Sequence, residues 1–156
     1  MSASKLAEFL DAVGPDGTVT VHVSASGKVR PVPRRTVAID FDGVIHKHIS
    51  PWTVPHEIHD GPVDGAFDFI ERVLFEFNVA IFSARAADPR GRAAIFEWLV
   101  ANWVASGKDR ELVAQIRVSA EKPHAFIYID DRGWHFEGTF PTMEELRSFE
   151  SWTKKL

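Results

Sequence analysis

The segment that most constrains the fold of this chain is residues 36–45, which read Thr-Val-Ala-Ile-Asp-Phe-Asp-Gly-Val-Ile. Its apolar residues are consecutive and not alternating, which is typical of a strand covered on both faces in a parallel α/β sheet. The strand ends in Asp40 and Asp42, and Gly43 then lets the chain turn. Ligands bind at the carboxyl ends of such strands, and two carboxylates placed there favour a cation or a shared proton. An ordinary strand-to-turn junction explains an Asp beside a Gly equally well.

The remaining chain is predicted to alternate between helices and strands. Apolar spacing predicts strands at residues 79–83, 116–118 and 125–130, and helices at residues 64–77, 89–105 and 142–152. Asp64 is a candidate cap for the first helix, and Thr142 with Glu145 has the spacing of a capping box. Strands that alternate with helices predict an α/β fold with a mainly parallel sheet.

Two regions are expected along the chain. Residues 34–156 would form one catalytic domain, which suits a total length of 156 residues. Residues 1–33 read as an N-terminal extension with a short helix, followed by a hairpin whose strands fall near residues 18–23 and 28–30.

Composition excludes several classes of protein. The net charge of −4 offers no overall basic field for nucleic acid or an anionic membrane, although a local basic patch stays possible. The absence of cysteine excludes disulfides and thiolate metal sites. No segment reads as a signal peptide or a membrane span, so we predict a soluble cytoplasmic protein, and the sequence does not indicate its oligomeric state.

Polar side chains follow three of the predicted strands. They are Asp40 and Asp42 after the first strand, Ser83 after the second, Lys122 before the last, and Asp130 and Asp131 after it. In a parallel sheet these groups converge at one edge. Carboxylates bind a hard cation, and Mg²⁺ is favoured where a phosphate supplies further ligands, which the lysine and the serine could help to hold. Taken singly, each residue has an ordinary explanation as a strand end, a solvated lysine or a polar loop.

In this order the residues resemble the motifs of the haloacid dehalogenase superfamily, whose members are mostly magnesium-dependent phosphohydrolases on a Rossmann-like sheet. Residues 40–45 match its first motif, the strand ending at Ser83 the second, Lys122 the third, and residues 130–131 the fourth. More narrowly, the chain is similar to a small phage and bacterial group in which Lys-Pro, here residues 122–123, precedes Tyr-Ile-Asp-Asp-Arg, here residues 128–132. Residues 136–138 and 140–141 continue that likeness, which covers residues 36–152 in all.

The resemblance implies a Rossmann-like three-layer fold and a reaction through an aspartyl-phosphate intermediate. Asp40 would be the nucleophile, and Asp42 would be the general acid and base, which requires its neighbours to raise its proton affinity. Lys122 would offset the charge of the intermediate. The metal ligands would be Asp40, Asp42, Asp130 and Asp131, and which of the last two dominates stays open.

Three residues are candidates for contact with the substrate phosphate, namely Ser83, Gly43 and Arg85. Gly43 also supplies the turn after Asp42. Arg85 could instead pair with a carboxylate, but its place two residues after Ser83 favours the substrate.

The spacing between the motifs leaves no room for a cap domain, so the predicted site is open. Residues 46–63 form a long loop that contains Trp52 and reads either as a lid or as a static, packed loop. Its histidines could form a second metal site, although loop histidines without acidic or cysteine partners are more often simply polar. They are His46, His48, His56 and His59.

The sequence therefore favours a magnesium-dependent phosphomonoester hydrolase that acts on a nucleotide, a nucleic-acid terminal phosphate or another small phosphoester. One alternative is a catalytically silent binding module that keeps the same scaffold. A receiver-like signalling domain is disfavoured by motif order, since its acceptor Asp would follow the third strand and its acidic pair the first.

Overall fold

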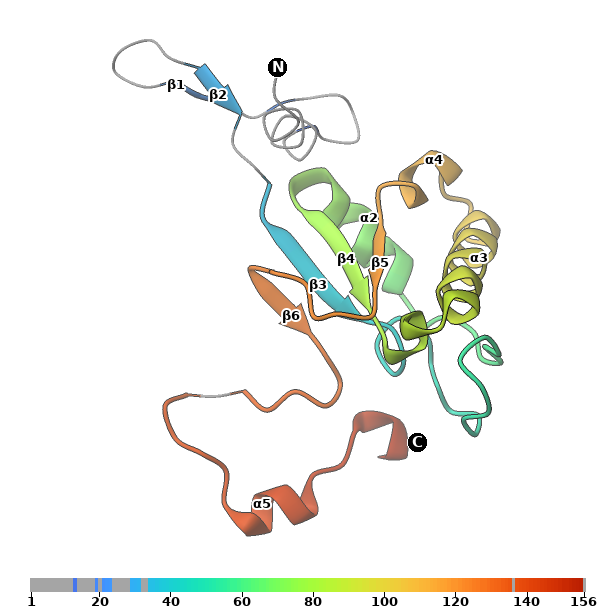
Figure 1. Ribbon diagram of the computed structural model, residues 1–156, viewed down its shortest axis with the longest axis vertical. Helices are drawn as coiled ribbons and strands as arrows, with labels where there is room; N and C mark the ends of the chain where they lie inside the picture. The colour runs from blue at the N-terminus through green and yellow to red at the C-terminus, as the bar shows by residue number, and fades with distance from the viewer. Residues whose placement is uncertain are drawn as a thin grey trace.

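A computed structural model describes residues 13, 19, 21–23, 29–31, 34–135 and 137–155 (Figure 1). Four parallel strands form its main sheet, in the order β5-β4-β3-β6. The two central strands are β3 (Thr36–Asp40) and β4 (Asn78–Phe82), and the edges are β5 (Arg117–Ser119) and β6 (Ile127–Ile129). The prediction of an α/β fold with a parallel sheet is confirmed.

One hydrophobic core lies between the sheet and the helices α2 (Ala66–Glu76) and α3 (Pro89–Ala105). Alternate residues of the central strands point into it, because neighbouring strand residues face opposite sides of a sheet. The core residues from these elements are Val37, Ile39, Val79, Ile81, Phe67, Ile70, Leu74, Ile95, Leu99 and Trp103. Both helices therefore cover the same face of the sheet.

The third layer implied by the resemblance is not among the elements of the described residues. The connection from β5 to β6, residues 120–126, crosses the sheet without a helix, so it adds no layer on the second face (Figure 1). The short α4 (Arg110–Val113) lies between α3 and β5 along the chain.

Helix α3 has the predicted bounds, and its start explains why. The Asp88 side chain accepts a hydrogen bond from Arg90 N at 2.8 Å, and Pro89 occupies the first helical position. Gly91 lets the helix pack against the single 3₁₀ turn η1 (Ala84–Ala87), because a Cβ atom there would lie 2.1 Å from Arg85 O. Helix α3 and η1, which follows β4, are thus held tightly together.

Two predicted helix boundaries are wrong. Helix α2 begins after Gly65, whose φ of 79° places it in the left-handed region, and it has no side-chain cap. Asp64 pairs instead with Lys47, with Nζ 3.1 Å from Oδ1. Helix α5 (Met143–Ser148) has the predicted capping box but ends early, and Trp152 begins the short η2 (Trp152–Lys155).

The predicted N-terminal hairpin is confirmed by β1 (Val21–Val23), which pairs antiparallel with β2 (Val29–Pro31). The predicted N-terminal helix lies outside the described residues, except for Val13, which forms an antiparallel bridge with Val19. Phe136 also lies outside the described residues. Within the described parts of the chain, every helix is too short or too polar to cross a lipid bilayer.

Candidate functional site

Three carboxylates meet at the carboxyl ends of two neighbouring strands. Asp40 ends β3, and Asp130 and Asp131 follow β6, which pairs with β3. One oxygen atom from each of the three lies within 4.8 Å of the others. The structure therefore brings together three of the four acids predicted to bind metal.

Asp131 is the most enclosed member of this cluster, with a side chain only 1% exposed. Its Oδ2 atom accepts a hydrogen bond from Ser151 Oγ. Its Oδ1 atom is buried and has no hydrogen-bond partner among the described residues. A buried carboxylate oxygen without a donor is costly, so the position favours a cation.

Gly43 and Trp152 hold the turn against Asp131. Gly43 has a φ of +89°, and a Cβ atom at this position would lie 2.6 Å from Asp131 Oδ2. Only glycine fits both the backbone conformation and the approach of the carboxylate. The Gly43 carbonyl accepts a hydrogen bond of 2.7 Å from Trp152 Nε1. The phosphate contact predicted for Gly43 stays a prediction, and its observed role is to admit Asp131.

Asp40 is held in an environment that disfavours its charge. Burial raises its pKa to about 7, with repulsion from Asp130, Asp131 and Asp42 acting in the same direction, against a hydrogen bond of 2.8 Å from Phe41 N. A bound cation would reverse this balance by stabilising the carboxylate.

Asp42 belongs to a second cluster. Its carboxylate accepts bonds from Arg85 Nε at 3.0 and 2.8 Å and from His46 Nδ1 at 3.0 Å. Burial alone would raise the pKa of Asp42, but the bonds from His46 and Arg85 outweigh it and hold the pKa below 3.8. The expectation that neighbours raise the proton affinity of Asp42 is therefore wrong, because both neighbours donate to its charged form.

His46 is a buried partner of Asp42 whose role the sequence did not reveal. Its side chain is 2% exposed, and its ring stacks on Phe41 with centroids 5.3 Å apart. Its Nε2 atom accepts from Asp60 N at 3.2 Å, so Nδ1 carries the hydrogen that Asp42 receives. In the sequence, His46 follows the Asp-x-Asp-Gly turn after only Val44 and Ile45. This position close to Asp42 was the signal that could have revealed its role.

A histidine metal site receives limited support. Asp42, His46 and His48 have ligand atoms within 4.8 Å of one another, but hydrogen bonds already use both nitrogens of His46. Neither His56 nor His59 joins this group within the described residues. The four histidines of the loop are thus not gathered around one point.

Arg85 anchors the 46–63 loop to Asp42. Its side chain is 3% exposed, and Nη1 donates to Glu57 O at 2.8 Å and Pro55 O at 3.2 Å. Its Cζ atom lies 4.1 Å from the centroid of the Trp52 ring. The loop is thus packed in place, as the static interpretation predicts. Of the two roles open to Arg85, the structure shows the carboxylate pair, and the phosphate contact stays a prediction.

In the structure, Ser83 and Lys122 both contact residues outside the carboxylate cluster. Ser83 is buried at the end of β4, and its Oγ atom caps η1 by accepting from Arg85 N at 3.2 Å. Lys122 is exposed, with Nζ 4.2 Å from the centroid of the Tyr128 ring. No ion pair among the described residues joins it to a site carboxylate, so the structure does not bring Lys122 to Asp40.

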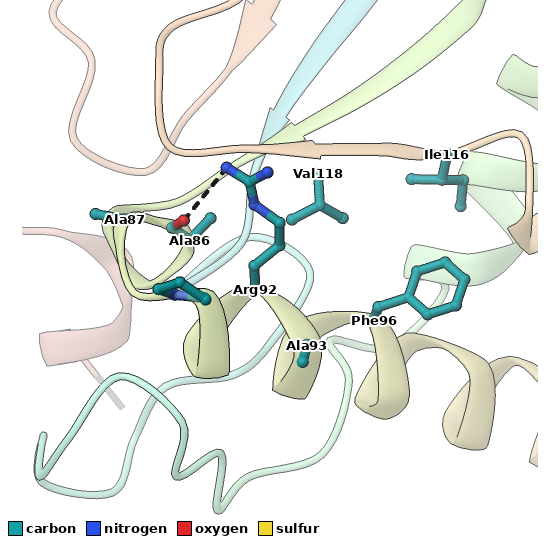
Figure 2. Close-up of a pocket in the computed structure, with 8 residues that line it drawn as sticks. Ala86, Ala87, Arg92, Ala93, Phe96, Ile116 and Val118 are labelled. Carbon is teal, nitrogen blue, oxygen red and sulfur yellow. Dashed lines mark hydrogen bonds between the residues drawn. The ribbon is translucent and has the colours of Figure 1, made fainter.

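A pocket of about 610 Å³ lies beside this region, between η1, the start of α3 and the edge strand β5 (Figure 2). Its walls are mainly apolar, and Arg92 is its charged residue. The lining residues are Ala86, Ala87, Pro89, Arg92, Ala93, Phe96, Ile116 and Val118. None of the site carboxylates lines it, so it is distinct from the carboxylate cluster.

No known family model, curated protein or solved structure matches this chain. Membership of the haloacid dehalogenase superfamily therefore stays a prediction from the motifs.

Proposed function

We propose that this protein is a magnesium-dependent phosphomonoester hydrolase, built on a capless, Rossmann-like fold of the haloacid dehalogenase type. The observation that supports it best is the cluster of Asp40, Asp130 and Asp131, with a buried Asp131 oxygen that accepts no hydrogen bond from the described residues. The substrate would be a phosphorylated small molecule or a phosphorylated nucleic-acid end.

The donor set fits Mg²⁺, a hard cation that prefers carboxylate oxygens and keeps positions for phosphate and water. Asp40, Asp130 and Asp131 would hold the ion. When bound, Mg²⁺ would withdraw charge from the phosphoryl oxygens.

Asp40 would carry the transfer itself. One of its oxygens would attack phosphorus and form an acyl-phosphate bond, while the bond from phosphorus to the leaving oxygen breaks. Water would then cleave the intermediate to release inorganic phosphate and restore the carboxylate.

Asp42 would protonate the leaving oxygen and afterwards accept a proton from the attacking water. The bonds from His46 and Arg85 oppose this protonation. A phosphate oxyanion that competes for the Arg85 guanidinium would weaken one of these bonds and raise the proton affinity of Asp42. The phosphate contact expected of Arg85 would then couple substrate binding to proton transfer.

A catalytically silent binding module is the second candidate. It is favoured by the low pKa of Asp42 and by the position of Lys122 on the Tyr128 ring. Such a module would bind Mg²⁺ and a phosphorylated ligand without turnover.

Hydrolysis of p-nitrophenyl phosphate, measured with Mg²⁺ and with EDTA, separates the two candidates. The hydrolase should release p-nitrophenol only with the metal, and Asp40→Asn should abolish release. Asp64→Asn is the matched control, because this exposed Asp pairs with Lys47 outside the cluster. Absence of metal-dependent turnover on this probe and on a panel of phosphoesters would favour the binding module.

A further inference from the structure

The outer surface of the site carries a tryptophan ring with one side supported and much of the rest open. The guanidinium of Arg85 lies 4.1 Å from the centroid of the Trp52 ring and is itself 3% exposed, so the ring covers this cation. Trp52 nevertheless remains 49% exposed. Because one face of a flat ring is occupied, the opposite face accounts for much of this exposure.

The orientation of the ring is fixed by what lies beneath it. Arg85 is bound on one side to the Asp42 carboxylate and on the other to the carbonyls of Pro55 and Glu57. A cation held in this way keeps the aromatic face against it in one plane. A surface that is ordered beforehand loses little conformational entropy when a ligand stacks on it.

The ring stands close to the proposed chemistry. Its centroid is 6.1 Å from that of the His48 ring, edge to face, and His48 Nδ1 is 3.4 Å from Asp42 Oδ1. Trp52 thus contacts His48, which in turn contacts Asp42. A ligand whose phosphate reaches Asp40 could place a neighbouring flat group on the ring.

We propose that Trp52 is a stacking platform for a nucleobase, so that the substrate is a base joined through its sugar to a terminal phosphomonoester. This inference rests on the proposed function for the phosphate but on the ring geometry for the base. Aromatic stacking accepts every base and contributes strongly to the binding of single nucleotides and strand ends.

The test compares a nucleoside 5′-monophosphate with ribose 5-phosphate, which has the same sugar phosphate without a base. The ratio of their kcat/KM values should fall about tenfold in Trp52→Ala, in line with the stacking energy of one base, mainly through KM of the nucleotide. Trp52→Phe should retain most of the ratio. Phe75→Ala is the control, since Phe75 is also an exposed aromatic residue. It lies in the last turn of α2, just before β4 begins, whereas the site lies where the strands end.

An equal loss of kcat/KM for both compounds in Trp52→Ala would overturn the platform, because it would mean that the ring only covers Arg85. Equal use of the two compounds by the unaltered protein would overturn it as well, while leaving the hydrolase proposal intact.

A binding experiment keeps the two proposals separate. Calorimetric titration of the Asp40→Asn protein with nucleoside monophosphate should show binding that Trp52→Ala weakens about tenfold, whether or not any phosphoester is hydrolysed. Oligonucleotides with 3′- or 5′-phosphate ends, used in the same titration, distinguish a strand end from a free nucleotide, and tighter binding of either source than of ribose 5-phosphate supports the platform.

Discussion

Ser151 shows how a residue without sequence signal can govern the carboxylate cluster. Its hydroxyl donates to Asp131 Oδ2 and so orients the carboxylate whose other oxygen has no hydrogen-bond partner in the described part of the chain. We expect Ser151→Ala to weaken Mg²⁺ binding about 10- to 100-fold, the usual effect of losing a partner of a metal ligand. Isothermal titration calorimetry checks this.

Ser148→Ala is the matched control for that experiment, because Ser148 is exposed and donates to a carbonyl of its own helix, Glu145 O. If Ser151→Ala binds Mg²⁺ as tightly as the Ser148 variant does, Asp131 does not act as a ligand in the way proposed.

The raised pKa of Asp40 makes metal binding depend on pH. With a pKa of about 7 in the folded protein against 3.8 for an ordinary Asp, the folded chain binds more protons than the unfolded chain between these values. Its metal-free stability should therefore fall as pH rises from about 4 to about 7 and then level off. Mg²⁺ competes with the proton, so its affinity should rise over the same interval.

Calorimetry in buffers of different ionisation enthalpy measures the proton released when Mg²⁺ binds. Release should approach one proton at pH 6 and vanish near pH 9. Affinity that stays constant from pH 6 to pH 9 would show that Asp40 is already charged in the free protein.

His46 tests the second cluster. Replacement by Ala removes a donor to Asp42 and leaves Asp60 N without its acceptor, so we expect a loss of roughly 1–3 kcal/mol in stability. The pKa of Asp42 should rise, because a bond to its charged form is gone. Urea unfolding measures the first effect and carboxyl-carbon NMR titration the second.

His59→Ala is the comparison for His46, since His59 is half-exposed and its ion pair with Glu57 spans 3.6 Å. Equal stability of the two variants would show that the buried histidine contributes little.

At the scale of elements, the contact between η1 and α3 positions both Ser83 and Arg85. Gly91→Ala would place a methyl group 2.1 Å from Arg85 O and 3.0 Å from Pro55 Cβ, so backbone must move. We expect a loss of about 1–3 kcal/mol, as for other overpacked sites. Urea unfolding compares it with Gly61→Ala, where the added methyl group meets no atom within 4 Å. Similar midpoints for the two variants would contradict the close packing.

The elements that the sequence predicted best are those whose signal is local. The consecutive apolar residues of β3 and β4, the Asp88-Pro89 start of α3 and the capping box at Thr142 all act within a few residues. The start of α2 was misplaced because Asp64 faces Lys47, a partner 17 positions away that no local pattern reveals.

The features of the site also divide into those with a signal in the sequence and those without one. Strand order alone places Asp40, Asp130 and Asp131 at one edge, so their meeting could be predicted. The electrostatics of Asp42 could not, because they depend on how the 46–63 loop folds back to present His46 and on the direction that Arg85 takes.

For the molecule as a whole, Mg²⁺ should act as a stabiliser. A ligand that binds only the folded chain adds about 2.7 kcal/mol at a concentration 100 times its Kd. Differential scanning calorimetry should show Tm rising with Mg²⁺ and returning on addition of EDTA. Asp131→Asn should lose this response, whereas Asp64→Asn should keep it. A Tm that does not change with Mg²⁺ would contradict the proposed metal site.

The hydrogen bond from Trp152 to Gly43 joins residues 109 positions apart. Contacts between such distant residues form slowly, because chain entropy is lost before the contact is gained. The pairings of β3 with β4 and of β4 with β5, which span 42 and 37 positions, can form first, whereas β6 pairs with β3 across 90 positions. Competence to bind metal is then among the last properties that the chain acquires as it folds. By the same reasoning it is among the first lost when the tail opens locally, so Mg²⁺ binding would weaken in denaturant before the core unfolds.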